Sequence, residues 1–280
     1  QGFNPFKFGI TGSTDNHNAT NTGDEDDFYG VSGILDSDGQ RRGAVPLDTP
    51  AADGSLYFDR YTRFSASGLT GAWAEENSRE ALYDAFRRRE TFGTSGPRMK
   101  VRFFAGYDLP EIDDDNLIES SYRNGVAMGS DLLAERNSTP AFFAWAAKDP
   151  NSAPLQRLQI IKGWIADGEA HEQIYDIACS DNISIDPNTN RCSDNGATVN
   201  LQDCSISASL GASELKARWT DPAYNPEQNA FYYVRALENP SCRWSTWDAV
   251  RAGVVPRTDI PATLQERIWS SPIWAIPENG

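Results

Sequence analysis

The sequence is poor in the residues from which many catalytic centres are built. Its 280 residues include two histidines and four cysteines, and no two cysteines form the close Cys-x-x-Cys pair of metal knuckles and thioredoxin-like motifs. A glycine-rich phosphate loop of the Walker or Rossmann type is absent. A Ser-His-Asp triad would have to use His17 or His171, and no serine lies in a nucleophile elbow. These absences argue against nucleotide binding and serine hydrolysis.

Positive charge and long apolar runs are also scarce. Lys and Arg number 25 against 40 Asp and Glu, a net charge of -15, and so acidic a surface repels a phosphate backbone. No stretch reaches the roughly 18–20 apolar residues of a membrane span, and the mean hydropathy is -0.55. We therefore expect no nucleic-acid partner and no membrane span. The acidity suits divalent cations, which prefer oxygen ligands, but the more common explanation is a solvated surface that keeps the protein in solution.

The four cysteines lie close together among polar residues. Cys179, Cys192, Cys204 and Cys242 fall in a tract rich in Asp, Asn, Ser and Pro. An even number of cysteines in polar loops favours two disulfides and an oxidising compartment, periplasmic or extracellular. Three pairings are possible; Cys179–Cys192 with Cys204–Cys242 is preferred, and the others stay open.

The first third of the chain reads as a strand, a long loop and a helix. Residues 3–10 alternate like a strand that leads into a polar loop, and residues 19–60 look like a surface excursion. The pattern predicts a helix over residues 77–91, with Asn77 as its cap, Glu80 in the capping box and three arginines at its end.

After Pro97 the pattern changes to short apolar and β-branched runs separated by turn residues. They cover residues 99–105, 141–146, 155–165, 174–178, 215–219, 231–237 and 273–276. With no second strong helix signal, they predict a β-sandwich. We place a domain boundary near Gly96-Pro97, between residues 1–96 and 97–280.

Asp15 and His17 are the strongest candidates for metal ligands. They follow the predicted strand directly and stand two residues apart, so on an extended segment both side chains point the same way. A catalytic metal normally needs at least three protein ligands. The acidic run 24–27 offers a further carboxylate without EF-hand spacing, and Glu75 and Glu76 are also explained by the helix dipole.

A second reading uses the tryptophans. Trp244 and Trp247 stand in the run CRWSTW, with Trp269 and Trp274 further on, and such a group forms either a stacking surface for a sugar or part of the core. The alternative function is therefore a secreted binding module that presents these aromatics, or the 19–60 loop, to a glycan or protein partner.

Several motifs together resemble a known family. Residues 8–18, FGITGSTDNHN, resemble the last metal-binding motif of the PHP (polymerase and histidinol phosphatase) superfamily, in which an Asp-x-His ends a late barrel strand. Residues 71–98, 239–248 and 265–274 look like a large bacterial family of uncharacterised, mostly exported, PHP-like proteins. The resemblance spans essentially the whole chain and matches the C-terminal part of such proteins.

The resemblance implies a fold and an activity. Residues 1–96 would be the closing strands and last helix of a distorted α/β barrel, followed by a disulfide-stapled β-sandwich over residues 97–280. Asp15 and His17 would bind divalent metal (Zn, Mn or Fe) in a phosphoesterase-like hydrolase for a small-molecule or phosphoester substrate. The remaining ligands would come from an N-terminal portion of the same protein, and this chain alone would be inactive.

Overall fold

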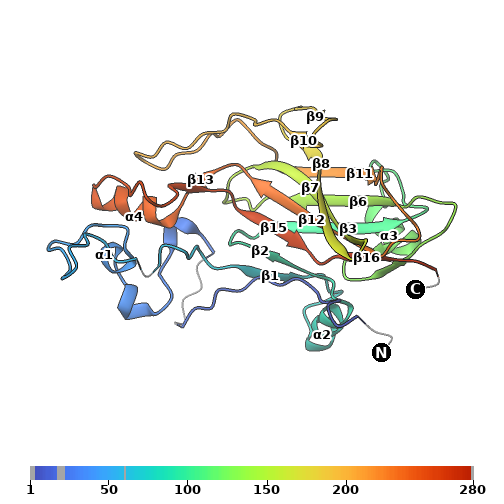
Figure 1. The fold of residues 1–280 in the computed structure, drawn as a ribbon, viewed down its shortest axis with the longest axis horizontal. Helices are drawn as coiled ribbons and strands as arrows, with labels where there is room; N and C mark the ends of the chain where they lie inside the picture. Colours follow the sequence, from blue (N-terminus) through green and yellow to red (C-terminus); the bar gives the residue numbers. More distant parts are fainter. Residues whose placement is uncertain (1–3, 18–22, 60, 279–280) are drawn as a thin grey trace.

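In the computed structural model, which describes residues 4–17, 23–59 and 61–278, two antiparallel sheets dominate and helices are few (Figure 1). The larger sheet contains β1 (Leu69–Ala72), β2 (Thr91–Thr94), β5 (Asp131–Leu133), β7 (Leu155–Ala166), β8 (Glu169–Cys179), β12 (Ala230–Glu238), β15 (Arg267–Ser270) and β16 (Ile273–Ile276). The smaller contains β3 (Lys100–Gly106), β4 (Val126–Ala127), β6 (Ala141–Ala147) and β11 (Glu214–Thr220). All seven apolar runs predicted after Pro97 are confirmed as strands or parts of strands.

The core lies between the two sheets. Strand β12 alternates strictly between buried and half-buried residues, because successive side chains point to opposite faces of a strand. Its Tyr232 meets Phe142 of β6 across the interface, with ring centroids 4.4 Å apart. Val101, Phe103 and Ile160 belong to the same buried cluster. Two sheets with one shared core form a sandwich, as expected for the second part of the chain.

One position in the larger sheet, beside β12, is filled by two short strands instead of one continuous strand. β15 and β16 both pair with the same side of β12, and Ser271-Pro272 separates them. On their other side, β15 pairs antiparallel with β2, whereas β16 pairs parallel with β5. Strands from before and after residue 96 thus share one sheet. The expected boundary near Gly96-Pro97 stays a prediction.

The strands do not close into a barrel within the described residues. The larger sheet runs from β1 at one edge to β8 at the other, and every described pair except β5–β16 is antiparallel. The β1–β2 pair, from the part expected to end an α/β barrel, joins the sandwich sheet through β15. The sheet-rich, disulfide-containing part of the expectation is confirmed.

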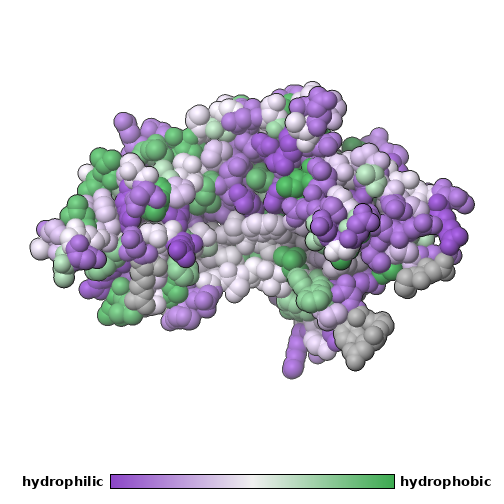
Figure 2. Space-filling view, in the orientation of Figure 1, coloured by the Kyte–Doolittle hydropathy of each residue, from purple (hydrophilic) through white to green (hydrophobic). Residues whose placement is uncertain are grey.

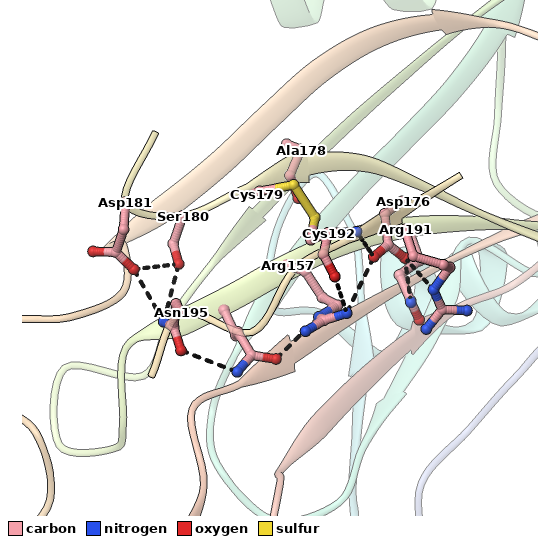
Figure 3. Close-up of a disulfide and its surroundings, with 11 residues drawn as sticks. Arg157, Asp176, Ala178, Cys179, Ser180, Asp181, Arg191, Cys192 and Asn195 are labelled. Carbon is pink, nitrogen blue, oxygen red and sulfur yellow. Dashed lines mark hydrogen bonds and ion pairs between the residues drawn. A yellow bond between two sulfur atoms is a disulfide. The ribbon is translucent and has the colours of Figure 1, made fainter. Parts of the chain in front are cut away.

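Both preferred disulfides form, Cys179–Cys192 and Cys204–Cys242. Cys192 belongs to β10 (Arg191–Cys192), which pairs with β9 (Ile185–Asp186), and Cys242 belongs to β13 (Ser241–Cys242), which pairs with β14 (Thr263–Leu264). Beside the first bridge, Asp176 is buried and accepts hydrogen bonds from the Cys192 amide at 2.7 Å and from Arg157 at 3.2 Å (Figure 3). The bridge and this carboxylate therefore both hold the β9–β10 hairpin against β8.

The helices lie outside the two sheets, at the left-hand end of the sandwich and along its lower and right-hand sides (Figure 1). α2 (Arg79–Arg88) confirms the helix predicted over residues 77–91 but starts later, because Ser78 and not Asn77 is its cap. α3 (Leu117–Asn124) and α4 (Trp244–Ala252) are helices that the pattern did not predict. Residues 23–59 hold short helices only: η1 (Glu25–Asp27), η2 (Gly33–Asp36) and α1 (Gly39–Arg42).

A small second core joins these short helices to α4. Trp244 is 1% exposed and packs on Phe28, with ring centroids 4.8 Å apart, and its indole donates to the Phe64 carbonyl at 2.8 Å. Arg42 of α1 forms a two-point ion pair with Asp248 of α4, at 2.7 and 2.9 Å. The long excursion expected over residues 19–60 is therefore tied down, in its described part, by aromatic packing and a nearly buried ion pair.

Candidate functional site

The segment that carries Asp15 and His17 lies along β1. The Thr70 hydroxyl donates to the Gly12 carbonyl at 2.6 Å, and the Ile10 amide donates to the Ser271 hydroxyl at 2.8 Å. A Cβ at Gly12 would stand 2.2 Å from the Leu69 carbonyl oxygen, so only glycine permits this close approach. The His17 amide donates to the Val31 carbonyl at 2.8 Å. These contacts hold the backbone of the segment in place.

The strand predicted over residues 3–10 is wrong for residues 4–10, which form no strand; Phe3 lies outside the described residues. Asn4 accepts a hydrogen bond from the Phe6 amide on its side chain, at 2.9 Å, which starts a turn instead of a strand. Phe6 and Phe8 are 70% and 59% exposed. The alternation that suggested a half-buried strand therefore places its apolar side chains toward solvent.

Asp15 and His17 are both exposed. The backbone of Asp15 is left-handed, with φ +54°, so the segment is not continuously extended and the same-side argument made for the two residues does not apply. Between them, the Asn16 amide donates to the Thr14 hydroxyl at 3.0 Å and the Asn16 side chain donates to Ser67 at 3.3 Å. Neither candidate side chain makes a hydrogen bond or ion pair with another described residue.

The two candidates fit only part of a metal centre. Among the described residues, no three His, Cys, Asp or Glu side chains lie close enough together to hold a metal ion. A catalytic metal requires at least three protein ligands and an open position. Any metal site that contains Asp15 and His17 must therefore take further ligands from elsewhere.

The acidic run 24–27 has a structural role at its centre. Glu25 is buried, and its two carboxylate oxygens accept hydrogen bonds from the amides of Ala66, at 2.5 Å, and Trp244, at 2.6 Å. Desolvation raises the pKa of Glu25, and these two amides oppose the rise. Trp244 is the first residue of α4, so the carboxylate also meets the positive end of that helix dipole. Glu75 and Glu76 are exposed before α2.

An acidic cavity of about 500 Å³ lies beside this run. Asp24, Asp26 and Glu266 line it, and the Cys204–Cys242 bridge contributes to its wall. Burial, with a smaller contribution from Glu25, raises the pKa of Glu266 to about 8, and the Ser95 hydroxyl that donates to it opposes the rise. Glu266 could not be singled out from the sequence, because an isolated glutamate before a strand has no distinctive pattern.

A second buried glutamate is close to this cavity. Burial raises the pKa of Glu238, at the end of β12, to about 7, and the Ser152 hydroxyl donates to one of its oxygens at 2.5 Å. The other oxygen has no hydrogen-bond partner among the described residues. Two buried carboxyls with raised pKa values thus stand close enough to interact, since Glu238 contributes to the shift of Glu266.

The four tryptophans considered for binding a partner are buried or half-buried. Trp244 belongs to the core, which is one of the two roles considered for it, and it therefore does not meet a partner at the surface. Trp247 is half-buried, with the Arg251 guanidinium 5.3 Å from its ring centroid, and Trp269 and Trp274 are half-buried on β15 and β16. His171, expected at the surface, is exposed on β8.

The fold defines a disulfide-containing β-sheet protein with two packed antiparallel sheets. A family model described as "Protein of unknown function (DUF3604)" matches residues 1–277, and the chain belongs to this family. No curated protein and no solved structure matches the chain. In the described residues, no helix is both long and apolar enough to cross a bilayer.

Proposed function

We propose that this chain is one part of a metal-dependent, phosphoesterase-like hydrolase related to the PHP superfamily. Asp15 and His17 supply two ligands for a divalent metal ion, Zn, Mn or Fe, and an N-terminal portion of the same protein supplies the rest. The supporting observation is that both side chains are exposed, make no hydrogen bond or ion pair with another described residue, and stand on a backbone anchored to β1. Exposed, unused ligands on a fixed backbone are available to an ion.

The surface around this segment also supports a missing partner. Among the described residues, ten of the fifteen large apolar side chains that are strongly exposed lie before residue 97. They include Phe6 and Phe8 on the candidate segment, Ile34 and Leu35 on η2, and Phe86 on α2. Figure 2 shows a hollow in the lower surface of the molecule, between α2 and the part that contains α1 and α4. Large exposed apolar surfaces mark interaction sites, and a second polypeptide seated here would complete the barrel.

We propose a periplasmic or extracellular location. The two disulfides are compatible with an oxidising compartment. As substrate we propose a small molecule or a phosphoester.

The metal content of the protein tests the proposal. The chain is produced with and without the region that precedes it in its gene, and Zn, Mn and Fe are measured by elemental analysis, with hydrolysis of a chromogenic phosphodiester as a second readout. We expect near-stoichiometric metal only in the longer form. Asp15→Asn and His17→Ala in that form should remove metal and turnover together.

His171→Ala is the matched control, since His171 is the other histidine of the chain and is also exposed. It should leave the metal content unchanged. Equal metal in the His17→Ala and His171→Ala forms would refute the assignment. No metal in either length of protein would favour the alternative, a secreted binding module for a glycan or protein partner.

A further inference from the structure

Two adjacent cavities open on the outer face of the smaller sheet. The first, of about 240 Å³, is lined mainly by apolar and aromatic side chains that include Ile118 and Trp145, and Lys100 also contributes to its wall. The second, of about 590 Å³, is lined by charged side chains and Tyr122. Both cavities share Trp73 and Arg102 in their walls. They form one binding groove, an apolar half beside a polar half, which we call the Trp145 groove.

The shared wall between the two halves is held rigidly. The Arg102 guanidinium carbon stands 3.4 Å from the centroid of the Trp73 ring, and the Trp73 indole donates to the Val101 carbonyl at 2.8 Å. Arg102 also donates to the Tyr122 hydroxyl at 2.6 Å. A guanidinium stacked on a ring that is itself fixed keeps its donors aimed in one direction, which lowers the entropy lost on binding.

Trp145 forms the aromatic platform of the apolar half. It lies on β6 between two cross-strand neighbours, Arg102 of β3 and Lys216 of β11. Its indole donates to Glu214 at 2.9 Å, and its side chain is half-buried and lines the cavity. The Lys216 ammonium stands 5.7 Å from the centroid of the Trp145 ring. The part of the ring that lines the cavity offers apolar surface to a flat partner.

The polar half balances its charges. Arg88 and Arg102 contribute two guanidinium groups, and Glu75 and Glu90 contribute two carboxylates. Glu90 is buried and accepts from Arg88 at 3.3 Å and from the Tyr122 hydroxyl, which helps raise the Tyr122 pKa to about 12, after desolvation. A balanced set of planar donors and acceptors suits a ligand with many hydroxyls and no net charge.

We propose that the Trp145 groove binds an uncharged saccharide. A sugar ring presents C–H groups on its faces and hydroxyls around its rim. The faces would stack on Trp145, and the hydroxyls of the next unit would bond to Arg88, Arg102 and Glu75. Because the protein carries a net charge of -15, its field disfavours polyanionic glycans. The groove is independent of Asp15 and His17, so this proposal does not depend on the metal site.

Binding to defined sugars tests the proposal. Isothermal titration is run on the purified protein with gluco-, xylo-, manno- and galacto-configured neutral oligosaccharides of about six units, and with oligouronates of equal length. We expect saturable binding of at least one neutral series, with the oligouronates weaker by about tenfold. Trp145→Ala and Arg88→Gln should each weaken binding by about tenfold, the change that loss of one stacking or charge-assisted contact produces.

Trp164→Ala is the matched control, because Trp164 is a half-buried tryptophan on β7 of the larger sheet and lines neither cavity. It should bind as the unchanged protein does. The side chain of Arg88 is half exposed, so Arg88→Gln reports on the groove even if Trp145→Ala fails to fold. The proposal is overturned if no neutral series binds, if oligouronates bind as tightly, or if Arg88→Gln changes nothing.

Discussion

Two buried glutamates make the stability of this protein depend on pH in an unusual direction. The pKa of Glu238 is raised to about 7 and that of Glu266 to about 8, mainly by desolvation, against an ordinary value of 4.5 in the unfolded chain. Between 4.5 and these values the unfolded state has released protons that the folded state keeps, so the free energy of unfolding falls as pH rises. The protein should be more stable at about pH 5 than at about pH 8.

Urea unfolding at about pH 5, 6.5 and 8 measures this slope. The double variant Glu238→Gln with Glu266→Gln keeps both sites neutral and should flatten the dependence over this window. Asp259→Asn is a control, since Asp259 is exposed and its pKa is lowered by the hydrogen bond from Arg257. A wild-type curve that is already flat would show that neither glutamate holds its proton in the folded protein.

Some residue contacts could be predicted from the sequence and others could not. The disulfide pairing was preferred correctly, because each bridge joins cysteines that are neighbours along the chain and the intervening polar loops can fold back. Burial in the core was one of the two roles considered for Trp244, but its partners could not be named from the sequence. Its partners Phe28 and Phe64 are about 200 residues away, and a local pattern does not contain contacts of that range. The burial of Glu238 and Glu266 likewise depends on contacts with residues far away in the sequence, Ser152 and Ser95.

At the scale of elements, the cap of α2 gives a sharp test. The Ser78 hydroxyl accepts from the Ala81 amide at 3.2 Å, whereas Asn77, the cap expected from the sequence, precedes the capping position. Ser78→Ala should lower the free energy of unfolding by about 1 kcal/mol, because it removes a partner from an otherwise unbonded helix amide. Chemical denaturation measures the change.

Asn77→Ala serves as its comparison and should leave the stability nearly unchanged. An equal loss of stability in both variants would mean that the start of α2 varies in solution and that either residue can cap the helix.

The strands followed from the sequence better than the helices did. Strands such as β7 and β12 are dense in β-branched and aromatic residues and have clear turn residues at their ends. α4 carries two tryptophans, a threonine and a valine in nine residues, which favour strands. It is helical because tertiary contacts hold it: Glu25 bonds its first amide and Arg42 pairs with Asp248. Such contacts override local propensity.

At the scale of the whole molecule, the two disulfides should contribute unequally. Cys204–Cys242 spans 38 residues and Cys179–Cys192 spans 13. Because a longer closed loop removes more entropy from the unfolded chain, replacing the first pair by alanines should lower the free energy of unfolding by about 4 kcal/mol and the second by about 3 kcal/mol. Denaturation of the two double variants compares them.

Each variant keeps the other bridge intact, so the two measurements share one background. A larger loss on removing Cys179–Cys192 would indicate that native contacts around that bridge, among them the buried Asp176, matter more than loop length.

The two short strands beside β12 also set the order in which the protein can be assembled. β15 and β16, residues 267–276, lie between β12 and the strands β2 and β5, and a ribosome makes them after every other strand of both sheets. Until they emerge, β1 and β2 have no route into the larger sheet. That sheet therefore completes only after synthesis has passed residue 276, and until then the β1–β2 pair stays outside it, so that the nascent chain passes through a partly folded intermediate.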